Sequence, residues 1–186
     1  MAATPSTMLP LGTRLPEFAL MDTLRGATVN SRDWAGKPVL VMFICNHCPY
    51  VIHVRDELTR LADEYGRRGV AVVAINSNSV KTHPQDGPEA MKVLGDKLGW
   101  QFPYLFDETQ AVAKAFQAAC TPEFYLFGND GALVYRGQLD GSRPGNAVPV
   151  TGSDLRGAME ALLEGRPVSS DQKPSIGCNI KWHPSA

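Results

Sequence analysis

Two cysteines separated by two residues follow a short apolar run and precede a proline. The motif Cys45-Asn46-His47-Cys48 stands directly after the apolar run 38–44, and Pro49 comes next. The run is rich in β-branched residues and has the length of a buried strand, whereas proline is favoured in the first turn of a helix. The sequence therefore predicts a strand over 39–44 and a helix over 50–68, with both thiols at their junction.

The segment after Pro49 carries one apolar stripe at helical spacing. Apolar side chains recur there at alternating intervals of three and four residues, and Gly69 stands where such a helix would end. The pattern indicates an amphipathic helix. The stripe consists of Val51, Val54, Leu58, Leu61 and Tyr65.

The paired thiols indicate redox chemistry. Cysteines two residues apart can close a small disulfide ring or stay reduced, so the pair can store and transfer two electrons without a cofactor. The positive end of the helix dipole and the free N–H groups of the first turn favour a thiolate. We expect Cys45, on the exposed side of this turn, to have a lowered pKa and to be the attacking sulfur. We expect Cys48, one turn inward, to be the resolving thiol.

Two other interpretations of the pair stay open at this point. A zinc site would need two further ligands, which Cys178 and His183 could supply at a C-x4-H spacing. However, no second Cys-x-x-Cys occurs, and a strand–helix junction is an unusual place for a zinc knuckle. The pair could also be inert cysteines of the core. We favour the redox interpretation and predict no metal.

The composition limits the classes of partner. The chain has 186 residues, 44% hydrophobic and 20% charged, which is ordinary for one soluble domain. Lysine and arginine total 18 against 19 for aspartate and glutamate, without a basic run, which disfavours binding to nucleic acid or to an acidic membrane. No stretch is apolar enough to span a bilayer, and the first ten residues do not resemble a leader. We expect a cytoplasmic location.

Strand and helix patterns alternate along the rest of the chain. A hairpin is predicted around the turn 22–26, and a second around Gly128-Asn129-Asp130-Gly131. The continuous apolar run 70–75 predicts another buried strand, and a polar loop follows it over 76–87. The remaining predictions are helices over 88–98, over 109–119 with Thr109 as its cap, and over 154–164 with Ser153 as its cap, and a strand over 102–106.

This order of elements, with the thiols at the tip of the first strand–helix unit, resembles the thioredoxin superfamily. The resemblance implies an α/β fold with a central mixed sheet, helices on both faces, an N-terminal β-hairpin and a C-terminal tail extension. Thr121-Pro122 lies just before the strand expected at 124–127, where thioredoxin-like proteins carry a cis proline facing the dithiol. The resemblance thus implies that Pro122 is cis and keeps a backbone N–H away from the sulfurs. Thr121 and its neighbours would present backbone groups to a substrate disulfide.

Five further segments are similar to the peroxiredoxin-like, thiol–disulfide oxidoreductase branch of that superfamily. This similarity implies an enzyme that exchanges disulfides with a protein or small-molecule thiol through the Cys45–Cys48 pair. His47, between the thiols, either stabilises the Cys45 thiolate or faces solvent. The five segments are 12–18, 43–51, 121–127, 140–145 and 174–182.

A thiol peroxidase is the alternative activity, with Cys45 oxidised to a sulfenic acid that condenses with Cys48. Peroxiredoxins carry Thr or Ser three residues before the reactive cysteine. Met42 stands three residues before Cys45, and Cys45 itself stands three residues before Cys48, so neither cysteine fits. Arg143 would be an activating cation only if its loop folds over the site. A further alternative is a non-enzymatic zinc or partner-binding module that uses the tail.

The tail and the other two cysteines remain to be placed. Cys120 has an apolar setting that fits a small buried residue. We expect a single domain over 1–186, with a core at 12–165 and a docked tail at 166–186, because the tail contains too much apolar surface to leave in water.

An extended tail would place Ile176, Cys178 and Ile180 on one face, since side chains alternate along a strand. Cys178 would then face the protein. It would be either a packed residue or a third thiol beside Cys45.

Overall fold

A mixed seven-stranded sheet forms the centre of the computed structural model, which describes residues 3–184. Its strands lie in the order β3-β2-β6-β5-β4-β8-β9. The neighbours β4, β5 and β6 are parallel, and the other pairs are antiparallel. The strands are β2 (Ala19–Asp22), β3 (Ala27–Asn30), β4 (Val39–Phe43), β5 (Ala71–Asn76), β6 (Tyr104–Phe106), β8 (Glu123–Phe127) and β9 (Leu133–Gly137).

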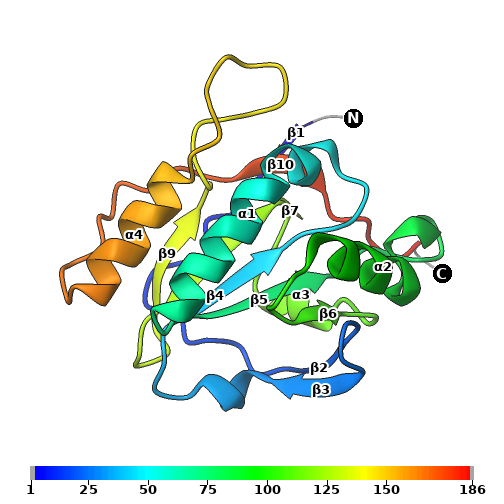
Figure 1. Cartoon of the computed structure of the whole chain (residues 1–186), viewed down its shortest axis with the longest axis horizontal. Helices are drawn as coiled ribbons and strands as arrows, with labels where there is room; N and C mark the ends of the chain where they lie inside the picture. Colours follow the sequence, from blue (N-terminus) through cyan, green and yellow to red (C-terminus); the bar gives the residue numbers. More distant parts are fainter. Residues whose placement is uncertain (1–2, 185–186) are drawn as a thin grey trace.

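Helices cover both faces of this sheet, which confirms the predicted fold class. Alternate side chains of β4 enter two separate apolar clusters, because successive strand residues point to opposite faces. Leu40 and Met42 face α1, α2 and α4, whereas Val41 and Phe43 face α3. In Figure 1, α1 crosses the front of the sheet between α4 and α2. The helices are α1 (Pro49–Arg67), α2 (Pro88–Leu98), α3 (Ala111–Ala115) and α4 (Ser153–Leu163).

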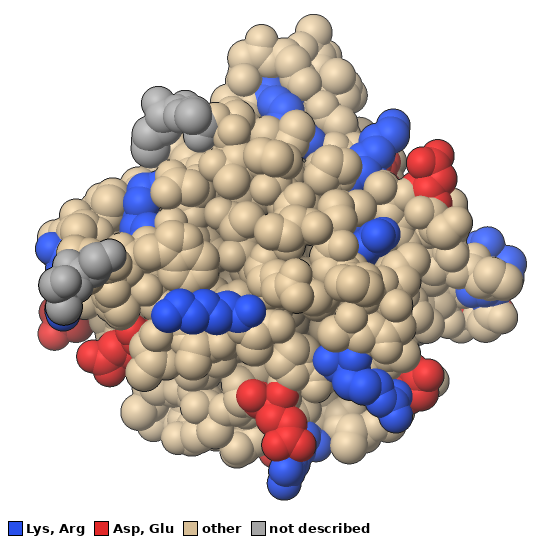
Figure 2. Space-filling view, turned by 180° about the vertical axis from the view of Figure 1, so that it is seen from behind, with Lys and Arg blue, Asp and Glu red and all other residues tan. Residues whose placement is uncertain are grey.

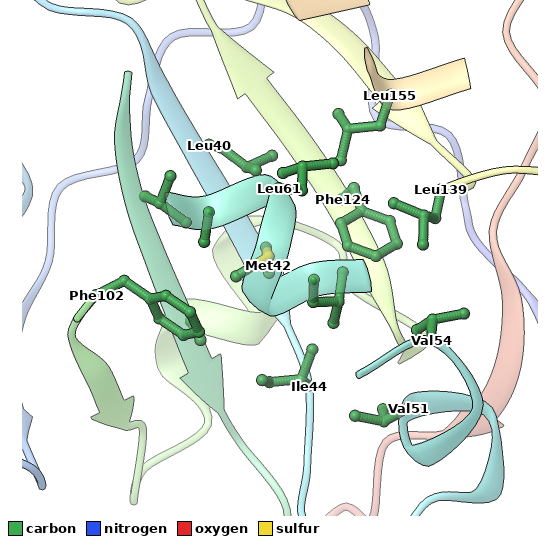
Figure 3. Packing of buried hydrophobic residues seen from close by; sticks show 14 of the residues in the cluster. Leu40, Met42, Ile44, Val51, Val54, Leu61, Phe102, Phe124, Leu139 and Leu155 are labelled. Atoms are coloured by element: carbon green, nitrogen blue, oxygen red, sulfur yellow. The ribbon is translucent and has the colours of Figure 1, made fainter. Parts of the chain in front are cut away.

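The apolar stripe of α1 packs as the spacing predicts. All five stripe residues are buried, and they share one cluster with the inward side chains of β4 and β8. Figure 3 shows Val51, Val54 and Leu61 in this cluster with Met42 and Phe124. Burying each large aliphatic side chain contributes roughly 1.5–3 kcal/mol. The stripe therefore anchors the helix whose first turn carries Cys48.

A second, three-stranded sheet was not predicted. It has the order β1-β10-β7 and joins β1 (Ala3–Pro5) and β10 (Ile176–Asn179) to the short strand β7 (Cys120–Thr121). Both pairings are antiparallel. In Figure 1, β1 and β10 lie together near the N-terminal end of α1. The tail thereby reaches the thiol end of the molecule.

The prediction that three alternating tail residues share one buried face is wrong for the first of them. Cys178 and Ile180 are 3% and 1% exposed, but Ile176 is 37% exposed. Ile176 pairs with Pro5 at the end of β1. Gly177 and Cys178 are the buried part of β10.

Two helix starts also differ from the predictions. The helix α3 is shorter than 109–119 because residues with left-handed backbone flank it: Gln110, its N-cap, has φ 62°, and Gln117 has φ 52°. Gly152, also left-handed, is the N-cap of α4, so Ser153 is the first helical residue rather than the cap. Both predicted hairpins are present, β2–β3 and β8–β9.

Charged side chains are dispersed over the face of the molecule that Figure 2 shows. Figure 2, which shows the molecule from behind, has lysine and arginine scattered among aspartate and glutamate rather than gathered into one field. Among residues 3–184, no helix is both long and apolar enough to cross a membrane.

Candidate active site

The loop between β4 and α1 places Cys45 and Cys48 against each other. A hydrogen bond joins the two thiols. Cys48 is the N-cap residue of α1, and Pro49 begins the helix, as the sequence predicts. Cys45 is 1% exposed and Cys48 is 0% exposed. The expectation of an exposed Cys45 is therefore wrong for this conformation.

The lowered pKa falls on Cys48, whereas the sequence predicts a lowered pKa for Cys45. The pKa of Cys48 is lowered to about 5, first because of the neighbouring Cys45 thiol and then, against the opposing effect of burial, because of its contacts with Cys178, Thr121 and the Val51 N–H. The pKa of Cys45 is raised, chiefly because it donates to Cys48, then because it is buried and lies near Asp86. The helix begins after Cys48, so its free N–H groups act on that sulfur.

We predict that the reduced protein holds one thiolate that titrates near pH 5, measured by the ultraviolet absorbance of thiolates. Cys48→Ala should abolish this titration step near pH 5. Cys45→Ala should move it upward, because the largest cause of the lowered pKa is the Cys45 hydrogen bond. This thiolate stabilises the folded state fully above its ordinary pKa of 9.0, and the contribution is lost as the pH falls through about 5. A step that persists in Cys48→Ala would reject the assignment.

The loop before β8 completes one side of the dithiol. The Thr121–Pro122 peptide bond is cis, which confirms the predicted conformation. Thr121 contacts both cysteines: its Oγ1 lies 3.5 Å from Cys45 Sγ, and its carbonyl oxygen lies 3.3 Å from Cys48 Sγ. The structure thus brings together Cys45, Cys48 and the Thr121-Pro122 pair, which the sequence singled out separately.

His47 is directed at Asp86 rather than at solvent. Its Nδ1 lies 2.6 Å from Oδ2 of Asp86, and its side chain is 19% exposed. An ionised carboxylate only accepts hydrogen bonds, so Nδ1–H donates to Asp86. His47 also stacks on His83, with 5.0 Å between ring centroids. A ring nitrogen of His47 lies within 4.8 Å of Cys45 Sγ, close enough to act on that thiol directly as well as through Asp86.

Asp86 is the site residue that the sequence reasoning missed. It lies at the end of the 3-10 turn η2 (Pro84–Asp86), is 0% exposed, and accepts hydrogen bonds from the Asn46 N–H and Asn78 Nδ2 at 2.9 and 2.8 Å. Cys45 Sγ, a His47 ring nitrogen and an Asp86 oxygen lie within 4.8 Å of one another. The strand order could have indicated it. Cys45 follows β4 and Asp86 follows β5, and loops that follow neighbouring parallel strands leave the same edge of the sheet.

Cys178 lies beside Cys48, not beside Cys45 as its third-thiol interpretation supposed. The sulfurs of Cys178 and Cys48 are 2.7 Å apart. Burial raises the pKa of Cys178 to about 12, and its contact with Cys48 adds to the shift. Three cysteine sulfurs therefore form a continuous row with Cys48 in the middle.

The other residues considered from the sequence lie elsewhere. Cys120 Sγ lies 3.8 Å from Glu123 Oε2, and burial raises its pKa. Arg143 donates to the backbone oxygens of its own loop and to Gln138 Oε1. His183 directs its ring nitrogens to Ser79 Oγ and the Glu108 carbonyl. The zinc set that included His183 is thus not assembled.

Solved structures and curated sequences similar to this chain agree with this architecture. A conserved protein of Geobacillus kaustophilus is 57% identical, with a TM-score of 0.97 over 100% of this chain and 99% of the other. A thiol:disulfide interchange protein of the thioredoxin family from Chlorobium tepidum, 16% identical, shares the fold with a TM-score of 0.63 over 82% of this chain and 97% of the other.

Among the curated proteins, the thiol-disulfide oxidoreductase ResA of Halalkalibacterium halodurans is 27% identical over 124 residues. That match covers 66% of this chain and 65% of the relative. The model of the AhpC/TSA family matches residues 11–136, which include the dithiol, Asp86 and the cis proline. Because this match spans more than half of the sequence, the chain belongs to the AhpC/TSA family.

Proposed function

We propose that this protein is a thiol–disulfide oxidoreductase whose redox centre is the Cys45–Cys48 pair. The observation that carries the proposal is the pair itself: two adjacent thiols at a helix N-terminus, one with its pKa lowered to about 5, beside a cis proline. A sulfur that is ionised at neutral pH can attack a disulfide or leave from one. The similarity to the ResA oxidoreductase supports the same chemistry.

In the reducing direction, the pair passes two electrons to a substrate disulfide. Transfer of the Cys45 proton to the Cys48 thiolate makes Cys45 the nucleophile. Its sulfur attacks the substrate disulfide, forms a mixed disulfide and releases one substrate thiolate. Cys48 then loses its proton and attacks the Cys45 sulfur, which closes the Cys45–Cys48 disulfide and releases the second substrate thiolate. One substrate thiolate takes up the proton that Cys48 loses and the other takes a proton from solvent, so the substrate gains two electrons and two protons.

The substrates we propose are protein or small-molecule thiols and disulfides. Both sulfurs are buried, so a partner reaches them only when a covering segment moves. Two segments lie against the dithiol and would have to move. The η2 turn is held to the Cys45 loop by the bond from Asn46 Nδ2 to the Gln85 carbonyl, and β10 pairs with Thr121. A cytoplasmic location stays a prediction of the sequence.

The test is the catalysed reduction of insulin disulfides by dithiothreitol. We expect Cys45→Ser and Cys48→Ser to lower turnover by at least about 100-fold, because each removes one of the two exchanging sulfurs. Cys120→Ser, which alters a buried thiol outside the row, is the matched control and should keep wild-type turnover. Cys48→Ser should also accumulate a mixed disulfide at Cys45. Undiminished turnover in the Cys45 and Cys48 variants would refute the proposal.

One contact favours peroxide reduction as a second candidate. Thr121 Oγ1 lies 3.5 Å from Cys45 Sγ and supplies a hydroxyl that the sequence pattern around Cys45 lacks. One observation weighs against it: Met42, which stands where peroxiredoxins carry Thr or Ser, is buried in the core. Hydrogen-peroxide turnover measured on the same preparation decides between the two activities. We expect it to be far slower than exchange.

A further inference from the structure

The tail strand β10 carries Cys178 to the dithiol in a fixed register. Cys178 pairs with Thr121 on one side and with Ala3 on the other, so both edges of the strand are occupied. Beyond the strand, the Ile180 N–H donates to the Ala119 carbonyl at 3.0 Å, and the Ser79 N–H donates to the Lys181 carbonyl at 2.8 Å. The backbone of the tail is therefore held on both sides of Cys178.

Gly177 makes this close approach feasible. A Cβ built on Gly177 would lie 2.0 Å from the Thr121 carbonyl oxygen and 3.2 Å from the Pro122 nitrogen. Backbone atoms cannot yield as a flexible side chain can, so any other residue here would push the tail away from the cis-proline loop. The sequence Gly177-Cys178 thus combines a residue without a side chain with a thiol directed at Cys48.

The position of Cys178 differs from that of an ordinary buried cysteine. Cys120 in the same chain shows the ordinary case, because its sulfur lies against the Pro122 and Glu123 oxygens. Cys178 Sγ instead lies 2.7 Å from Cys48 Sγ, so only a small side-chain rotation separates the two from a covalent bond. Cys48 consequently has a thiol partner on each side.

We propose that Cys178 is a third redox thiol, which exchanges with the Cys45–Cys48 disulfide by attacking Cys48. This inference rests on the proposed function, because that activity supplies the disulfide. The Cys178 sulfur forms a bond to Cys48 Sγ, and the Cys45–Cys48 bond breaks with its electron pair on Cys45. The proton lost by Cys178 is taken up by Cys45. One disulfide and one thiol are present before and after the step, so no further oxidant is needed.

The exchange gives the site two oxidised forms. In the first, Cys45 and Cys48 are joined and Cys178 is a free thiol. In the second, Cys48 is joined to Cys178, the tail is tied covalently to the start of α1, and Cys45 is free to attack a further disulfide. The tail is then an internal exchange partner of the dithiol as well as its cover.

Disulfide mapping in a Cys120→Ser background tests the proposal. The protein is equilibrated with reduced and oxidised glutathione, quenched in acid, alkylated, digested and examined by mass spectrometry. Adding Cys45→Ala leaves Cys48 and Cys178, and more than half of the oxidised protein should carry a Cys48–Cys178 disulfide. The matched control adds Cys48→Ala instead. It leaves Cys45 and Cys178 and should give glutathione adducts without an internal bond.

A second measurement uses the wild-type dithiol. Oxidised wild-type protein should contain a fraction of molecules with Cys45 alkylated and Cys48 joined to Cys178. Gly177→Ala should reduce that fraction several-fold while keeping the Cys45–Cys48 bond, since it displaces the tail without altering a thiol. Glutathione adducts alone in the Cys45→Ala protein, or a wild-type protein with only the Cys45–Cys48 bond, would overturn the proposal.

Failure of this inference is distinguishable from failure of the proposed function. If only the third-thiol proposal is wrong, Cys178→Ser should keep wild-type insulin reduction and a Cys45–Cys48 disulfide. If the proposed function is wrong, the wild-type protein itself should form no Cys45–Cys48 disulfide and should reduce no insulin.

Discussion

Truncation after Gly165 is expected to lower the melting temperature by roughly 10 °C. The truncation removes β10 and exposes the surface that Ile180 covers, and that side chain is 1% exposed in the intact protein. Burial of an isoleucine side chain contributes roughly 1.5–3 kcal/mol, and each backbone hydrogen bond about 1 kcal/mol. For a chain of this size, 1 kcal/mol corresponds to about 2–4 °C.

The same truncation should make the dithiol react faster with iodoacetamide, because β10 covers Thr121 and Cys48. Amide exchange around 176–182 in the intact protein should be slow. Removal of residues 185–186 alone is the control, since it leaves every described tail contact in place. An unchanged melting temperature together with rapid amide exchange in the tail would show that it does not stabilise the domain.

Asp86→Asn is expected to raise the reduction potential of the dithiol by about 30 mV or more. The charge of Asp86 raises the pKa of Cys45, so its removal stabilises a thiolate in the reduced form relative to the uncharged disulfide. About 30 mV corresponds to about 1.4 kcal/mol for a two-electron couple. The potential is measured at pH 8 against glutathione mixtures.

Asp107→Asn is the matched control for this change. Asp107 is also buried and accepts hydrogen bonds from Ser77 Oγ and the Ala113 N–H, at 2.8 and 2.9 Å. Both variants should be less stable, since each loses buried acceptors. Only the Asp86 variant should shift the potential. An equal shift in both would mean that the effect comes from destabilisation rather than from charge.

The central part of the fold was predictable because its signals are local. The apolar run before Cys45, the helical stripe after Pro49 and the turn residues 128–131 each specify an element within a short window. The small β1-β10-β7 sheet has no such signal. Its strands have 3, 4 and 2 residues, and β1 pairs with a strand about 170 positions away.

The residues that form the site were largely predictable from the sequence, whereas the pKa shifts of its thiols were not. The sequence identified the dithiol, Thr121, Pro122 and Cys178, but it predicts the lowered pKa for Cys45, whereas the structure gives it to Cys48. The pKa difference between the two thiols depends on contacts that only the folded chain makes. Asp86 was missed because it stands in a polar loop and reaches Cys45 only through the adjacency of β4 and β5.

The most direct test of the account is the redox equilibrium of the wild-type protein with glutathione, followed by disulfide mapping at each ratio of reduced to oxidised glutathione. The account predicts one cooperative two-electron transition, in which Cys45 and Cys48 become joined and Cys120 stays a free thiol at every ratio. Glutathione adducts on separate cysteines, with no bond between Cys45 and Cys48 at any ratio, would contradict it.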